Sequence, residues 1–210
     1  EAPALETRRL FLAWAEALQV DEREQEALAV LAVLEAREPD LDEPRRRRGE
    51  VFRLWASRCA ARHEYESALG ILSRLLEFEP DNAEVHAEVA NLHARWSSQE
   101  EAMGHLAEAL AIQRRLVDLQ PANSEARTAV VRLYGYQAAE ARSQCLYARA
   151  IAIYDELLDF EPSHAGARAA ISSVYIEWAR SLADQTKAVE AIEVLQALLQ
   201  REPGHQGALE

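Results

Sequence analysis

The sequence lacks the features that mark several protein classes. It contains no run of about 18 apolar residues and no basic N-terminal segment followed by an apolar one, so neither a membrane-spanning helix nor a signal peptide is expected. Its only cysteines, Cys59 and Cys145, are too few and too far apart in the sequence for a disulfide framework. We expect both thiols to be buried in a helical core. This usage predicts a soluble, cytoplasmic protein, with the periplasm as the alternative.

Glycine, proline and basic residues are also scarce. Seven Gly and seven Pro stand among 210 residues, of which 49% are hydrophobic, and this composition is typical of a helix-rich protein. Lys and Arg number 23 against 36 Asp and Glu, giving a net charge of −13. Nucleic acid and membrane insertion are therefore not expected, because both a phosphate backbone and an anionic bilayer surface need a basic face on the protein.

A repeat of 41 residues runs through the chain. Five prolines keep this spacing, as do four Trp positions with one interruption by Gln137. The proline column is Pro39, Pro80, Pro121, Pro162 and Pro203; the Trp column is Trp14, Trp55, Trp96 and Trp178. Two further columns hold alanine, from Ala27 to Ala191, and leucine, from Leu34 to Leu198. The predicted repeats are 1–39, 40–80, 81–121, 122–162 and 163–203, with 204–210 either the start of a further repeat or a tail left from cloning.

Each repeat is predicted to be a pair of antiparallel helices. In the last repeat, residues 171–182 place apolar side chains at helical spacing, and residues 191–199 form a second apolar stripe before Pro203. Short polar residues follow the inner prolines and are predicted to cap the next helix; they are Asp81 and Asn82, Asn123 and Ser124, and Ser163 and His164. One hairpin cannot bury both of its faces, so the hairpins must stack on their neighbours.

These residues resemble tetratricopeptide repeats over the whole chain. The stretch Tyr65–Leu69, followed by Pro80, is similar to the second helix of that family, and Glu79–Glu84 is similar to its junction between repeats. An aromatic column from Phe11 to Tyr175 matches the tyrosine of the family's first helix. The family's unit has 34 residues, so this chain resembles an elongated variant whose seven added residues extend the hairpin by about 10 Å of helix.

The resemblance implies an all-α, right-handed superhelical solenoid that binds a peptide or protein segment in a concave groove and does not catalyse. The groove positions that it implies vary from repeat to repeat, as a ligand-tuned surface would, although neutral drift on an exposed face would look the same. They are Arg9, Glu50, Arg53, Asn91, Arg95, Arg132, Tyr136, Ser173 and Glu177.

The interruption of the Trp column provides a separate hypothesis. Gln137 replaces the indole beside Gly135 and Tyr136, and a glycine within a helix indicates either a close backbone approach or room for a ligand. We predict that Gly135, Tyr136 and Gln137 form a notch for a partner side chain. The alternative is that Tyr136 or a neighbouring leucine fills the space.

Arg45, Arg46, Arg47 and Arg48 form the only long run of like charge. They belong to the basic part of the chain, since residues 40–80 carry 8 basic and 8 acidic side chains whereas residues 1–39 carry 4 and 9. The simplest interpretation is a solvated turn that balances neighbouring carboxylates. The alternative is an anion patch, because guanidinium groups bind carboxylate and phosphate through paired hydrogen bonds.

The sequence contains no motif for catalysis or for a cofactor. Cys59 and His63 could share one helix face, but no second pair completes a zinc site. No Gly-rich phosphate loop and no nucleophile elbow is present. We therefore predict a protein-interaction scaffold without metal or cofactor, with a non-catalytic recruiting arm of a larger enzyme as the alternative. Self-association through the open ends of the array is a third hypothesis.

Overall fold

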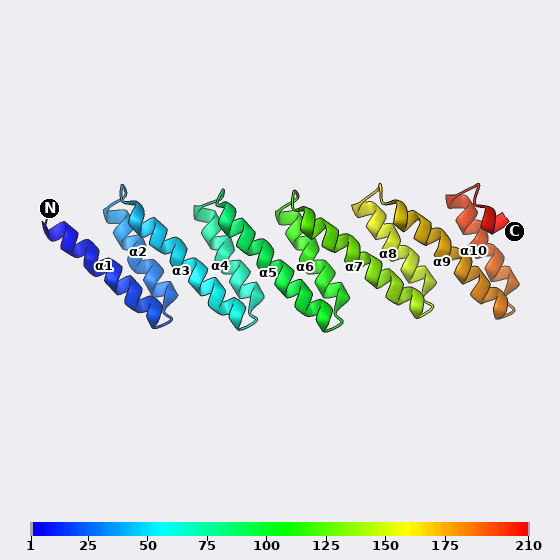
Figure 1. Cartoon of the computed structure of the whole chain (residues 1–210), viewed down its shortest axis with the longest axis horizontal. Helices are drawn as coiled ribbons and strands as arrows, with labels where there is room; N and C mark the ends of the chain where they lie inside the picture. The colour runs from blue at the N-terminus through cyan, green and yellow to red at the C-terminus, as the bar shows by residue number, and fades with distance from the viewer. Residues whose placement is uncertain (1, 210) are drawn as a thin grey trace. The chain divides into compact units, whose positions relative to one another are not determined.

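The computed structural model describes residues 2–209, and all of its elements in this range are α-helices (Figure 1). Long helices alternate with shorter ones. The long helices are α1 (Ala2–Val20), α3 (Asp42–Ala61), α5 (Ala83–Ala102), α7 (Ser124–Ser143) and α9 (Ala165–Asp184). The shorter helices are α2 (Glu24–Arg37), α4 (Tyr65–Phe78), α6 (Leu106–Leu119), α8 (Tyr147–Phe160), α10 (Ala188–Arg201) and the single-turn α11 (Gln206–Leu209). The chain is thus an all-α helical-repeat solenoid, as predicted.

Within the described range the helices form hairpins. Contacts join α1 to α2, α3 to α4, α7 to α8 and α9 to α10, and further contacts join neighbouring hairpins, as between α2 and α3 or α8 and α9. The chain separates into two contact units, Glu1–Trp96 and Ser97–Glu210, each of which is described by itself. The handedness of the superhelix stays a prediction.

The turn inside each hairpin is a left-handed helix cap. In each turn the central residue has a positive φ. These residues are spaced 41 apart and are Glu22, His63, Gly104, Cys145 and Thr186. The next amide then bonds back five residues, as from Glu64 N to Cys59 O at 2.9 Å, which is the Schellman arrangement. Cys145 is therefore exposed in a surface turn, so the prediction of a buried thiol is wrong for Cys145 and confirmed for Cys59.

The predicted caps at the junctions between repeats are confirmed. The side chain of Asn82 accepts from the amides of Glu84 and Val85, and that of Asn123 accepts from Ala126 N at 3.0 Å. His164 uses its ring Nδ1 to accept from Ala167 N at 2.9 Å. Each cap satisfies amides that the first turn of the following helix leaves without a helical partner.

The core consists of the two predicted aliphatic columns and of aromatic stacks. Ala27, Ala68, Ala109 and Ala150 are 0% exposed, as close packing of two helices requires. Trp96 stacks on Tyr65 in the first unit, and Trp178 stacks on Tyr147 in the second. Between residues 2 and 209, none of the helices has the length and the apolar character needed to cross a membrane.

Candidate functional site between α3 and α5

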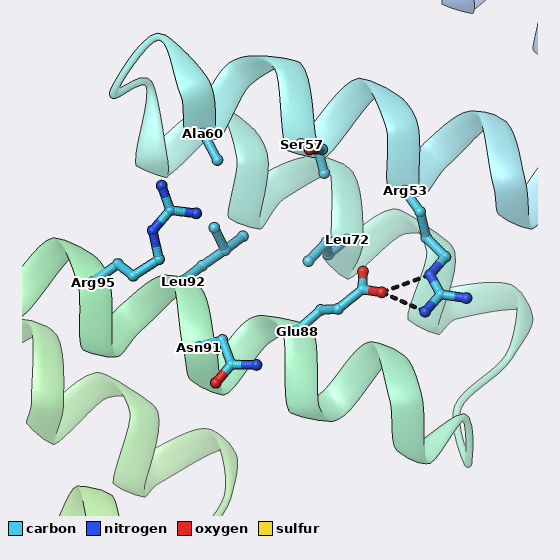
Figure 2. Close-up of a pocket in the computed structure, with 9 residues that line it drawn as sticks. Arg53, Ser57, Ala60, Leu72, Glu88, Asn91, Leu92 and Arg95 are labelled. Carbon is cyan, nitrogen blue, oxygen red and sulfur yellow. Dashed lines mark hydrogen bonds and ion pairs between the residues drawn. The ribbon is translucent and has the colours of Figure 1, made fainter.

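A cavity of about 240 Å³ opens in the first unit between the long helices α3 and α5 (Figure 2). Its floor is apolar and is built from small or aliphatic side chains of three helices. These are Ala56 and Ala60 from α3, Leu72 from α4 and Leu92 from α5. The remaining lining residues, Arg53, Ser57, Glu88, Asn91 and Arg95, are polar or charged. The cavity therefore offers an apolar bed with polar groups at its rim.

One end of the cavity is closed by an ion pair. Arg53 donates to Glu88 Oε1 at 2.6 Å and to Glu84 Oε2 at 3.0 Å, so α3 is tied to α5 at this point. The hydrogen bond to Glu88 is the main cause that raises the pKa of Arg53 above its usual value. This guanidinium is already satisfied and has little capacity for a ligand.

The other end of the cavity is open and carries free donors. Arg95 has no hydrogen bond or ion pair, and Asn91 makes no side-chain hydrogen bond, to any residue that the structure describes. The two residues lie one helical turn apart on α5 and both border the cavity, and Figure 2 shows the Arg95 side chain reaching toward Ala60 on α3. A guanidinium matches a carboxylate, which accepts several hydrogen bonds at once.

The corresponding face of the second unit is closed. Glu177 stands 82 residues after Arg95, and Arg142 stands 82 residues after Ala60. Arg142 on α7 pairs with Glu177 on α9 and also reaches Ser173 Oγ at 3.4 Å. The hydrogen bond from Arg142 lowers the pKa of the Glu177 carboxyl below its usual value. Two of the predicted groove residues, Ser173 and Glu177, are thus already in contact with Arg142.

The other predicted groove residues are also placed by the structure. Arg132 on α7 makes a two-bond ion pair with Glu101 on α5, at 2.6 and 2.8 Å, and lies over the ring of Tyr136. Glu50 pairs with Arg47 on its own helix, and Arg9 is exposed on α1. Of the predicted set, Arg53, Asn91 and Arg95 border the cavity between α3 and α5, while Ser173 and Glu177 border a separate cavity in the second unit.

Gly135, Tyr136 and Gln137 do not converge. Gln137 donates to the backbone oxygen of Leu106 at 2.8 Å and borders a separate polar cavity at the turn between α5 and α6. Nothing lies within 4 Å of the position a Cβ would take at Gly135, so this glycine does not mark a close backbone approach. The notch formed by all three residues stays a prediction without support from this geometry.

The run Arg45–Arg48 lies in the first turns of α3, and all four guanidinium groups are engaged. Arg45 and Arg48 pair with Glu35 of α2, and Arg46 and Arg47 pair with Glu43. Hydrogen bonds from both of the latter arginines lower the pKa of Glu43. The geometry agrees with the balanced-charge interpretation and leaves little capacity for an anion patch.

Cys59 and His63 do not form a metal pair. Cys59 is buried in α3, whereas His63 is exposed in the left-handed turn that follows. Over the described residues, no group of three or more His, Cys, Asp or Glu side chains is arranged to hold a metal ion.

Sequence reasoning missed the residues that decide which face is open. They are Ala60, Glu101 and Arg142, which occupy one column of the repeat, together with Glu88 and Ser57. A signal was present, because this column changes from neutral to acidic to basic along the chain. Comparing it with the column of Arg95, Tyr136 and Glu177 would have predicted the Arg142–Glu177 pair.

No family model matches the chain, and no curated protein matches it. It is similar to the tetratricopeptide-repeat domain of P58(IPK), at 16% identity and a TM-score of 0.28, over 95% of this chain and 52% of that one. It is also similar to the flexible tandem repeat domain of a bacterial cellulose synthase, at 18% identity and a TM-score of 0.29, over 95% of this chain and 87% of that one.

A third similar structure is the TPR2AB domain of yeast Sti1 in its complex with pHSP90. The identity is 14% and the TM-score 0.26, over 97% of this chain and 80% of that one. The chain spans about half the length of the P58(IPK) chain. Its own hairpins, with their capped junctions and buried alanine column, make its fold that of a tetratricopeptide-like helical repeat.

Proposed function

We propose that this chain is a protein-interaction scaffold that binds an acidic segment of a partner protein on the face between α3 and α5. The observation that carries the proposal is the unpaired guanidinium of Arg95 at the open end of a cavity that has an apolar floor and that Asn91 also borders. Two arginines on the long helix α7 of the second unit, Arg132 and Arg142, are by contrast each neutralised by a carboxylate of the chain.

The size of the cavity favours a peptide side chain over a free small molecule. A volume of about 240 Å³ is below the range of about 300–1,000 Å³ that is usual for small-molecule pockets. One carboxylate-bearing side chain and an adjacent aliphatic group would fill it. The floor of Ala56, Ala60 and Leu92 gives the aliphatic part an apolar contact.

Local charge decides the sign of the partner despite the net charge of −13. Around the cavity, Arg53 and Glu88 cancel, which leaves Arg95 as the only uncompensated charge among the lining residues. Charges farther away are screened within about 8 Å at physiological ionic strength. A carboxylate at the open end therefore interacts mainly with Arg95.

A peptide array tests the proposal. Eight-residue peptides would carry Asp or Glu, or their amides Asn or Gln, at one central position, and each would be probed with the purified chain. We expect a preference for the acids that Arg95→Glu abolishes and Arg115→Glu retains, because Arg115 is exposed and lies outside the cavity. Equal binding of acid and amide peptides by the unaltered chain would reject the proposal.

Salt provides a second readout. Binding to the array hits should weaken as ionic strength rises, because an exposed ion pair between Arg95 and the peptide is screened. The Arg115→Glu variant should keep most of this salt dependence, since Arg115 lies outside the cavity. Affinity that does not change with salt would indicate that the apolar floor alone binds the peptide.

The recruiting-arm and self-association hypotheses are tested by different experiments. A recruiting arm would use the same binding face, so the array serves both. Self-association would cover apolar side chains of α1, of which Leu10 is 67% exposed and Trp14 56% exposed. Sedimentation at several protein concentrations, with Trp14→Ser as the comparison, tests that hypothesis.

A further inference from the structure

The cap at the start of α9 differs chemically from those at the starts of α5 and α7. His164 accepts the amide hydrogen of Ala167 through Nδ1, whereas Asn123, in the same column of the preceding repeat, accepts that of Ala126 through its amide oxygen. An asparagine oxygen accepts at every pH. A histidine nitrogen accepts only while it is unprotonated, because both ring nitrogens of the imidazolium are donors.

The first turn of α9 also lacks the acidic residue found in its counterparts. Glu84 stands in the first turn of α5 and Glu125 in that of α7, where a carboxylate complements the helix dipole. At the equivalent position α9 has Gly166, and its first turn contains no acidic side chain. A Cβ at Gly166 would come within 3.2 Å of His164 Cε1, so the ring packs over this glycine.

The charged groups around the junction come from α7, α8 and α9. Glu161 ends α8, and its backbone oxygen accepts from His164 N, but in the described part of the chain His164 makes no ion pair with a carboxylate. On α9, Arg168 bonds to the backbone oxygen of Pro162. From α7, Arg127 lies over the ring of Phe160. Arg127 shares a cavity with the carboxylates of Glu156 and Asp159 on α8. The N-terminus of α9 opposes added positive charge on the ring.

We propose that His164 makes the junction between α8 and α9 acid-sensitive, whereas the junctions capped by Asn82 and Asn123 are not. Protonation removes the acceptor for Ala167 N and places a cation at a helix N-terminus. The cap is therefore present while the ring is neutral and is lost when the ring is protonated in acid, which opens the first turn of the helix that carries Ser173 and Glu177.

Amide hydrogen exchange tests the proposal within one molecule. The protection of Ala167 N, corrected for intrinsic exchange, should fall about fivefold between pH 7.5 and pH 5.5, which corresponds to the roughly 1 kcal/mol typical of one helix cap. Ala126 N, capped by Asn123, is the internal control and should keep its protection. If exchange at Ala167 is too fast to follow, its amide proton chemical shift, measured against that of Ala126, gives the same comparison.

Two variants separate the cap from other causes. His164→Asn should remove the pH dependence, because it installs the cap found at Asn123, and His164→Ala should lower the protection of Ala167 at both pH values. An equal fall in the His164→Asn variant, or unchanged protection and shift of Ala167 in the unaltered chain, would overturn the proposal.

Discussion

The face between α3 and α5 and the face between α7 and α9 are built from the same columns of the repeat, yet the first is open and the second is closed. At the position of Arg95 the second unit has Glu177, and at the position of Ala60 it has Arg142. The resulting ion pair spans the second face, whereas the small Ala60 leaves Arg95 unpaired. Two substitutions on a constant scaffold thus determine whether a guanidinium is available to a ligand.

The comparison also separates the roles of the columns. Ala68 and Ala150 are both 0% exposed, and Tyr65 and Tyr147 each stack on the Trp of the following long helix. Packing is therefore alike in the two units, and the difference is confined to the surface of the long helices. Substitutions in either unit can change one side of this comparison at a time.

The largest effect is expected from overpacking the shared core. Ala150→Leu in the second unit and Ala68→Leu in the first should each lower the free energy of unfolding by about 1–3 kcal/mol, because neither site has room for three more carbon atoms. Leucine is a good helix former, so helix propensity cannot cause the loss. Urea unfolding followed by circular dichroism measures it, and exposed Ala148 on α8, changed to leucine, is the control. Unchanged midpoints would refute the assignment of this column to the helix contact.

The second largest effect is expected from creating an unpaired arginine on the face between α7 and α9. Arg142→Ala combined with Glu177→Arg should give the second unit an unpaired arginine, as in the first, and raise the number of acidic peptides bound per chain from one to two. The reverse change, Ala60→Arg with Arg95→Glu, should weaken binding in the first unit about tenfold or more, a loss of about 1.4 kcal/mol. Isothermal titration calorimetry gives both quantities. If the number bound stays at one, residues other than this pair determine the open face.

A smaller gain in stability is expected at the left-handed turns. His63→Gly in the first unit and Cys145→Gly in the second should each raise the free energy of unfolding by about 0.5–1 kcal/mol, because glycine adopts positive φ without the clash of a Cβ. Part of the gain is offset by the greater freedom of glycine in the unfolded chain. Gly104→Ala, at φ 81°, should show the opposite change. Thermal unfolding of all three variants measures the series, and a loss of stability at both new glycines would contradict it.

The smallest effect concerns the ion pair itself. Because Arg142 lowers the pKa of Glu177, the pair stabilises the fold above the usual carboxyl pKa of about 4.3 and loses this contribution as the pH falls through the lowered pKa. Both side chains are more than a third exposed, so Glu177→Gln should cost less than about 1 kcal/mol at pH 7. Unfolding at pH 7 and near pH 2.5 should show this difference shrinking in acid, and a constant difference would assign the effect to packing instead.

The hairpins could be predicted from the sequence because the signals that start, stop and pack each helix are local and recur in every repeat. Apolar periodicity, Pro39 to Pro203 and the caps at Asn82 and Asn123 act over a few residues, and the 41-residue period marks each element five times. The exposed Cys145 was mispredicted because composition does not show that its column adopts positive φ. Only Gly104 marks that column in the sequence, and one glycine in five positions is a weak signal.

For the candidate site, the sequence by itself determined which helices and columns could face a ligand, and it selected Arg53, Asn91 and Arg95 among others. Only the tertiary structure decided that Arg95 is unpaired while Arg132 and Arg142 are neutralised, because each ion pair joins side chains about 31 to 35 residues apart on neighbouring helices. Such a pair forms only when packing brings two helices to a set distance and places both side chains within reach. The sequence shows only that each of these residues is an arginine. The neighbouring side chains in the fold decide whether its guanidinium is paired with a carboxylate of the chain or is available to bind one from a partner.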